Sequence, residues 1–251
     1  MTDKEEDLHA LIVAAGKGSR AKLPFPKSLY KVDGIPIILR IIGILPNTIK
    51  HIHIVINPEE EELFQQELEK CKKKYSFIYQ NSPKGMGDAV LRFKTSNNFE
   101  HCRNVLLIWG DVPFIKEKTI LELVNTFIKN NNDFAFVTSH SESSYTIVNR
   151  SRDGNVISLE ETRELGKSPK RGERDIGLFV FKKQIVFDLL EMDLDNKYGK
   201  ETGEHSFLYI VSHLVRQGRN VEAIQIASHE ETLSLNTQAD IQDINSNLLK
   251  H

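Results

Sequence analysis

Short apolar runs alternate with longer helix-like segments along most of the chain, and this alternation limits the fold more than any other feature. The runs are rich in β-branched and aliphatic residues, which predicts strands at 9–14, 51–57, 76–80, 104–109, 133–139, 145–149, 176–181 and 221–226. Helices are predicted between the early strands, at 37–44, 59–74, 87–94 and 118–130. Such alternation indicates βαβ units, a mostly parallel sheet, and ligands at the carboxyl ends of its strands.

The later region, roughly 140–185, shows strands and turns without a helix pattern, including a turn at 152–155. An antiparallel insertion beside the main sheet would explain this change. The sequence shows no internal repeat, low-complexity tract or disordered linker. We therefore expect one α/β domain over residues 1–251, with a Rossmann-like, mixed but mostly parallel central sheet flanked by helices.

Composition excludes several classes of protein. The formal net charge of −2 argues against a general nucleic-acid binder. The start is acidic and polar, unlike a signal peptide, and the longest apolar stretch, 35–46, is interrupted by Arg40 and too short to cross a membrane. Cys71 and Cys102 have no metal-ligand spacing. His51 and His53 share one face of a strand without a third ligand. We expect a cytoplasmic protein without nucleic-acid or membrane partners.

A glycine-rich loop with several basic side chains follows the first predicted strand. Gly16 and Gly18 allow positive φ angles and let backbone N–H groups approach phosphate oxygens. The third glycine of a dinucleotide fingerprint is missing, as is a lysine directly after Gly18. Arg20 can instead grip a phosphate bidentately, and Lys27 adds a compact charge. The pattern suits a triphosphate, and the competing interpretation is a surface turn with incidental basic residues.

A second candidate site lies at the end of the buried strand 104–109. Asp111 follows this strand, where α/β proteins bind ligands. A carboxylate there suits Mg²⁺, which prefers a few hard oxygen ligands together with substrate phosphates. An Asp that opens a turn before Pro113 is the simpler alternative.

The run AAGKGSR followed by six residues and a lysine resembles the signature of sugar-1-phosphate nucleotidyltransferases. It is most similar to the uridylyltransferase half of the bacterial N-acetylglucosamine-1-phosphate enzyme, and the resemblance extends over residues of about 10 to 245. It implies that Arg20 and Lys27 stabilise charge as pyrophosphate leaves. It also implies nucleotide binding by the loop residues Ala14, Ala15, Gly16, Lys17 and Gly18.

The same resemblance implies a metal pair. GDVPFI resembles the family segment whose Asp coordinates the metal, here Asp111. The segment 231–237 resembles the one that supplies an Asn ligand, here Asn236, although Ser234 replaces a glycine. Asn236 could also cap a C-terminal helix predicted at 237–249, and both roles are compatible. The implied cofactor is Mg²⁺.

Segments for the base and the sugar resemble the family less closely. Gln80, Gly85 and Met86 fall in a segment similar to the base-binding loop, but Met86, Asp88 and Pro83 replace its Thr, His and second Gln. On the acceptor side, the resemblance assigns sugar binding to Glu161 and Asp175. Asp175 replaces an Asn, so its carboxylate accepts hydrogen bonds but does not donate them.

The resemblance therefore implies Mg²⁺-dependent transfer of a nucleotidyl group from a nucleoside triphosphate to a sugar 1-phosphate. UTP and N-acetylglucosamine 1-phosphate are the leading substrates, with GTP, CTP or another sugar as alternatives. Residues of about 1–135 would form the nucleotide-binding half and about 136–235 the sugar-phosphate half, with a small antiparallel insertion on the acceptor side. Two other hypotheses are a catalytically silent paralogue that binds nucleotide sugars, and a nicotinamide-dependent dehydrogenase, which would need the missing third glycine.

Overall fold

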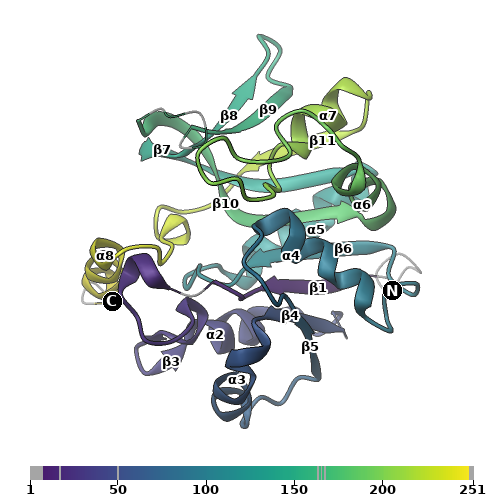
Figure 1. Cartoon of the computed structure of the whole chain (residues 1–251). Helices are drawn as coiled ribbons and strands as arrows, with labels where there is room; N and C mark the ends of the chain where they lie inside the picture. The colour runs from purple at the N-terminus through teal and green to yellow at the C-terminus, as the bar shows by residue number, and fades with distance from the viewer. Residues whose placement is uncertain are drawn as a thin grey trace.

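The structure, a computed structural model of the 251-residue chain, describes residues 8–16, 18–49, 51–162, 164, 166 and 168–248. Within these ranges, seven strands form one sheet in the order β11-β7-β10-β6-β1-β4-β5 (Figure 1). The strands are β1 Leu8–Val13, β4 Ile52–Ile56, β5 Tyr75–Tyr79, β6 Asn104–Trp109, β7 Phe134–Ser144, β10 Lys170–Lys182 and β11 Val221–Gln225. β10 runs antiparallel to β6 and β7, and the other neighbouring pairs are parallel. The predicted mixed, mostly parallel sheet is confirmed.

Helices cover both faces of the sheet because the central strands are apolar on both sides. Along β6, Leu106 and Ile108 belong to one buried cluster, and Val105 and Leu107 belong to the other. The first cluster packs against α2 Ile37–Ile44, α3 Glu61–Leu68, α5 Glu117–Lys129 and α8 Gln238–Leu248. The second packs against α4 Met86–Leu91, α6 Lys183–Glu191, α7 Ile210–Arg216, and the hairpin of β8 Thr146–Arg150 and β9 Val156–Glu161.

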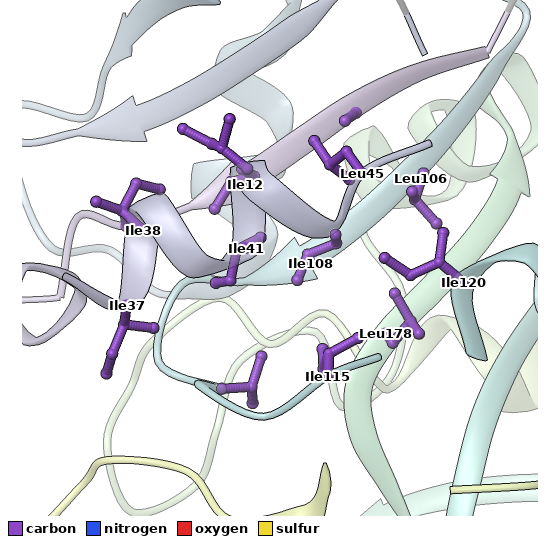
Figure 2. Packing of buried hydrophobic residues seen from close by; sticks show 14 of the residues in the cluster. Ile12, Ile37, Ile38, Ile41, Leu45, Leu106, Ile108, Ile115, Ile120 and Leu178 are labelled. Carbon is purple, nitrogen blue, oxygen red and sulfur yellow. The ribbon is translucent and has the colours of Figure 1, made fainter. Parts of the chain in front are cut away.

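Helix α2 shows how tightly the first face is filled. Its Ile38 and Ile41 lie in the same cluster as Ile12 of β1 and Ile108 of β6, and each is at most 1% exposed (Figure 2). Burying an aliphatic side chain of this size contributes about 1.5–3 kcal/mol, so the layer forms a rigid support. The loops that follow β1 and β6 are therefore anchored at their bases.

Several predicted boundaries need correction. The helix expected over 59–74 begins with the 3₁₀ turn η3 Pro58–Glu60 and ends at Leu68. The Cys71 N–H closes a turn onto Leu68 O at 2.9 Å, and β5 starts soon afterwards at Tyr75. β7 and β10 are longer than predicted because they pair with each other beyond the rest of the sheet. The expected antiparallel insertion is the two-stranded sheet of β8 and β9.

β9, α6 and α7 were not predicted, and neither were two short strands. The strands β2 Lys31–Val32 and β3 Ile35–Pro36 form a tight hairpin, with Asp33 at φ 52° and Gly34 at φ 73° in its turn. Two-residue strands carry too little alternation to be detected from sequence. This hairpin carries the chain from the glycine-rich segment into α2.

Candidate active site

The glycine-rich segment and the predicted metal-binding aspartate start at the same edge of the sheet. β1 and β6 are adjacent and parallel, and their last residues, Val13 and Trp109, are partners in register. Segment 14–27 follows β1, and Gly110 and Asp111 follow β6. This is the edge at which ligands bind in parallel α/β sheets.

The side chain of Lys27 lies close to the backbone of Gly16 and Gly18. Gly18 has φ 68°, a left-handed conformation that glycine adopts without strain. The Lys27 N–H donates a hydrogen bond to Gly16 O at 3.4 Å. A β-carbon added at Gly16 or Gly18 would lie 3.2 Å from Cε or Cγ of Lys27. The two glycines therefore leave room for the lysine stem beside the loop backbone.

The other described residues of the predicted triphosphate loop differ in their exposure to solvent. Arg20 lies on the 3₁₀ turn η1 Ser19–Ala21, and its side chain is exposed. Ala14 is buried, and its N–H extends the sheet by donating to Val55 O at 2.8 Å. Ala15 is half-buried and Gly16 is exposed. Lys17 lies outside the described residues.

Lys27, Asp111 and Asn236 meet although they are far apart in the sequence. The Lys27 ammonium group donates to Asp111 Oδ2 at 2.6 Å and to Asn236 Oδ1 at 2.9 Å. The side chains of Lys27 and Asp111 are only 17% and 15% exposed. The fold thus brings together the residues that sequence analysis assigned to triphosphate and metal binding.

Backbone contacts fix the position of Asp111. The Gly110 N–H donates to Val13 O at 2.8 Å, and a β-carbon on Gly110 would lie 2.7 Å from that oxygen. The Leu235 N–H donates to Asp111 O at 2.9 Å, which joins the C-terminal segment directly to the aspartate. Gly110 is therefore required by the close approach of the β1 and β6 ends.

Asn236 does not cap the C-terminal helix. Thr237 Oγ1 accepts from the Asp240 N–H at 3.3 Å, and Asp240 Oδ2 accepts from the Thr237 N–H at 2.7 Å. This reciprocal pair is a capping box, so Thr237 is the cap of α8. The Asn236 amide is consequently available to the site, where its nitrogen donates to Ser234 Oγ at 3.1 Å.

Sequence analysis missed a buried carboxylate that holds the segment leading to Asn236. Glu231 is 1% exposed and lies on η6 Glu230–Thr232. It accepts from the Lys116 N–H at 3.1 Å and from the N–H and hydroxyl of Ser228 at 2.9 and 3.0 Å. A buried carboxylate that accepts hydrogen bonds from two separate segments acts as a structural tie. The family-like segment around Glu231 was visible in the sequence, but its internal bonds were not.

The oxygen atoms at this point suit a hard divalent cation. Asp111 Oδ1 is buried, and no described residue gives it a hydrogen bond. A carboxylate and an amide oxygen are appropriate donors for Mg²⁺, which takes its remaining ligands from water and substrate phosphates. Over the described ranges, no group of three or more His, Cys, Asp or Glu side chains is placed to hold a metal by itself. Asp111 and Asn236 therefore fit a metal that is shared with a phosphorylated substrate.

Gln80 and Asp88 form the floor of the predicted base-binding loop. Gln80 is 6% exposed, and its amide nitrogen donates to Gly85 O at 3.1 Å and to Asp88 Oδ2 at 2.9 Å. Asp88 also pairs with Arg92. Burial alone would raise the pKa of Asp88, but the hydrogen bonds from Arg92 and Gln80 outweigh it and lower that pKa below its usual range. Asp88, which replaces the family's His, thus fixes the orientation of Gln80.

The same loop rests on a segment from the other half of the chain. The Gly87 N–H donates to His205 O at 2.9 Å, and the His205 N–H donates to Lys84 O at 2.7 Å. β-Carbons at Gly85 and Gly87 would lie 2.4 Å from His205 O and 2.3 Å from Ser206 O. Sequence analysis had no signal for this contact, because the partners are more than a hundred positions apart.

The two predicted sugar-binding residues lie in different environments. Glu161 ends β9 and accepts a hydrogen bond from the Ser206 hydroxyl. It lines a cavity of about 450 Å³ between β9, α7 and the 196–206 segment, together with Tyr198 and Arg216. Asp175 is completely buried in β10, where its Oδ2 accepts from the Gly177 N–H at 3.0 Å. Asp175 does not line that cavity.

Trp109 is a further residue that sequence analysis missed. Its indole Nε1 is buried, and no described residue accepts a hydrogen bond from it. Asp175 Oδ1 is also buried, and no described residue donates a hydrogen bond to it. Trp109 packs against Gly177 of β10 and lines a small cavity of about 70 Å³ together with Lys27, Met86 and Asp111. Unsatisfied buried polar atoms are uncommon, so each of these two atoms is a candidate for a contact with a ligand.

Comparison with known proteins fits this geometry. Residues 10–200 match the MobA-like NTP transferase domain. The chain belongs to this family. It is therefore a nucleotidyltransferase, in agreement with the resemblance found in its sequence.

Curated relatives of this NTP transferase include bifunctional GlmU proteins. The protein from Thermodesulfovibrio yellowstonii is 25% identical over 240 residues, covering 93% of this chain and 50% of the relative. The one from Clostridium tetani is 28% identical over 247 residues, covering 96% and 52%. The chain thus spans about half the length of the curated relatives it matches.

Solved structures share the fold at low identity. A Bacillus anthracis protein described as a candidate glucose-1-phosphate thymidylyltransferase, in complex with sucrose, has a TM-score of 0.74 at 16% identity and covers 96% of this chain and 94% of its own. The 4-diphosphocytidyl-2C-methyl-D-erythritol synthase from Anaerococcus prevotii has a TM-score of 0.66 at 17% identity, covering 98% of this chain and 97% of its own.

Across the described residues, no helix is both long and apolar enough to cross a membrane.

Proposed function

We propose that this nucleotidyltransferase joins a nucleoside triphosphate to a sugar 1-phosphate and releases pyrophosphate. UTP and N-acetylglucosamine 1-phosphate are the leading pair, because the sequence resembles the uridylyltransferase half of the N-acetylglucosamine-1-phosphate enzyme and the relatives are GlmU proteins. GTP, CTP or another sugar phosphate are the alternatives.

One observation carries this proposal: Lys27, Asp111 and Asn236 converge beside the glycine-rich loop. A loop for phosphates, a cation and two hard oxygen donors are the parts needed to bind and cleave a triphosphate. A surface turn with incidental basic residues would not bury Lys27 against an aspartate from the loop that follows β6. A nicotinamide-dependent dehydrogenase would not need Lys27, Asp111 and Asn236 to converge in this way.

The chemistry is a direct displacement. An oxygen of the sugar phosphate attacks the α-phosphorus of the nucleotide, and a new P–O bond forms as the bond from the α-phosphorus to the bridging oxygen breaks. The electron pair of the broken bond leaves with pyrophosphate. The protein contributes positioning and charge neutralisation rather than covalent chemistry.

Each part of the loop has an assigned task. Backbone N–H groups of the loop after Ala14 hold the triphosphate, and the exposed Arg20 can fold over the β- and γ-phosphates. Lys27 neutralises charge on the leaving group. Asp111 and Asn236 would hold Mg²⁺, which supplies Lewis-acid stabilisation of the phosphoryl oxygens when bound.

The nucleotide-binding half of about 1–135 would recognise the base through Gln80, Gly85 and Met86. Both amide hydrogens of Gln80 are occupied by Gly85 O and Asp88, so Gln80 offers the base an acceptor rather than a donor. The replacements at Met86, Asp88 and Pro83 depart from the family pattern and keep GTP and CTP among the candidates.

The sugar-phosphate half of about 136–235 would hold the acceptor. Glu161 would accept hydrogen bonds from sugar hydroxyls in its cavity. Asp175, with its unpaired Oδ1, would accept from a hydroxyl or amine, and the indole of Trp109 would supply a donor nearby. Cys71 and Cys102 have no metal-ligand spacing, which suits a reducing compartment, so we assign the reaction to the cytoplasm.

The test is a matrix of reactions. The chain is incubated with Mg²⁺, each common triphosphate and a panel of sugar 1-phosphates, and pyrophosphate release is measured. We expect release that requires both substrates and is strongest with UTP and N-acetylglucosamine 1-phosphate. Pyrophosphate release with another pair would reassign the substrates. No pyrophosphate release with any pair would favour a non-catalytic protein that binds nucleotide sugars.

A further inference from the structure

The Lys27 ammonium contacts the two oxygen donors that the proposed metal would need. Its nitrogen lies 2.6 Å from Asp111 Oδ2 and 2.9 Å from Asn236 Oδ1. These acceptors come from segments 84 and 209 positions further along the chain. The group is half-buried, so the two contacts are only partly screened by water. The positive charge of Lys27 therefore already occupies the two oxygen atoms that would bind the metal.

The surroundings hold the ammonium in this place. Lys27 starts the 3₁₀ turn η2 Lys27–Leu29, which fixes its backbone. Its stem runs past Gly16 and Gly18, where added β-carbons would lie 3.2 Å away. The lysine is thus directed toward Asp111 by the loop and does not reach it as a freely moving surface side chain.

We propose that Lys27 is a place-holder cation, which occupies Asp111 and Asn236 until a triphosphate draws it away. This inference rests on the proposed function. Without Lys27, the largely buried carboxylate of Asp111 would lack a counter-charge, which is costly. With Lys27 in contact, binding of a divalent cation by the same two side chains brings like charges together in a weakly screened site.

The consequence is an order of binding. A metal alone has to displace Lys27 without offering it another partner, so it binds weakly. A triphosphate supplies phosphate oxygens that accept from Lys27, and this frees the two donors. Nucleotide and metal therefore bind cooperatively, and each raises the affinity for the other by the same factor.

The test measures metal binding without catalysis. Free Mn²⁺, as a spectroscopic substitute for Mg²⁺, is titrated by electron paramagnetic resonance against the whole chain and its Lys27→Met variant, with no nucleotide present. Removal of the competing charge should tighten Mn²⁺ binding about tenfold or more. Lys31→Met is the matched control, because Lys31 is an exposed lysine paired with Glu67 on the surface. Its Mn²⁺ affinity should equal that of the unmodified chain.

Two further variants keep the result decisive. Lys27→Gln removes the charge but keeps a polar group, so it should show the same gain if Lys27→Met folds poorly. Adding Asp111→Asn to Lys27→Gln should abolish the gain, which locates it at that carboxylate. An unchanged or weaker Mn²⁺ affinity in a folded Lys27→Gln variant would overturn the inference, as would a gain that survives the loss of Asp111.

This outcome is separable from failure of the proposed function. If the unmodified chain releases pyrophosphate from a substrate pair but the Lys27 variants gain no Mn²⁺ affinity, only the place-holder inference fails. If the unmodified chain releases no pyrophosphate with any substrate pair, the proposed function fails, whatever the Mn²⁺ titrations show.

Discussion

Acidification should destabilise the chain through His53, a buried residue at the opposite end of β4 from the active site. His53 is 1% exposed, and its ring nitrogens lie 3.2 Å from His9 Nδ1 and 2.8 Å from Ser76 Oγ. Burial, followed by the neighbouring His9 and His51 rings, lowers the pKa of His53 from 6.5 to about 3. The folded state thus keeps this ring neutral over a range in which the unfolded chain protonates it.

The sign and size of the effect follow from linkage. Because the folded pKa is depressed, His53 changes nothing above pH 6.5, and stability is lost as pH falls from 6.5 toward 3. Each pH unit in this window costs about 1.4 kcal/mol. Between pH 7.5 and 5.0 the loss assigned to His53 is therefore about 2 kcal/mol.

Urea unfolding at pH 7.5 and 5.0, followed by fluorescence of the single tryptophan, Trp109, measures this loss. The His53→Gln variant should be less stable at pH 7.5, since packing against Phe93 is reduced, but its further loss at pH 5.0 should be smaller by about 2 kcal/mol. His101→Gln, at an exposed site, is the matched control and should follow the unmodified chain. Parallel pH dependence in the unmodified chain and His53→Gln would refute a neutral, buried His53.

Three further outcomes concern the site. Asp111→Ala should lower turnover by roughly three decades, about 4 kcal/mol of barrier, and near-normal pyrophosphate release would contradict its metal role. Gly87→Ala places a β-carbon 2.3 Å from Ser206 O and should raise the KM for the triphosphate about tenfold or more; an unchanged KM in steady-state kinetics would show that the loop does not position the nucleotide. Asp175→Asn should shift preference toward acetamido sugars over sugars with a free hydroxyl or amine, with little change in the KM for the triphosphate; unchanged ratios of kcat/KM between acceptors would exclude Asp175 from acceptor recognition.

The sequence predicted the central elements well because their signals are local. The predicted strand 104–109 coincides with β6, and the predicted helix 37–44 coincides with α2. Both are strongly apolar segments with clear flanking turns. The length of β10 was underestimated because its first half, from Lys170, is polar and is held by pairing with β7. Such pairing is a tertiary contact that composition does not encode.

The candidate site was predictable in its residues but not in its contacts. Gly16, Lys27 and Asp111 stood in recognisable motifs, and parallel topology placed their segments at one edge. The ammonium of Lys27 against Asn236 depends on the path of a segment 209 positions away, which no local pattern specifies. Thr237 rather than Asn236 caps α8 because Asp240 completes the capping box, a preference that could have been recognised from the spacing.

The backbone bonds between loop 84–87 and His205 have a consequence for how this chain could acquire new substrates. Ser206, the next residue, donates to Glu161 in the cavity proposed for the acceptor, so one short strip of chain contacts the predicted base-binding loop on one side and this cavity on the other. A substitution that displaces this strip alters both partners at once. On the proposed assignment of these two sites, the choice of nucleotide and the choice of acceptor would change together.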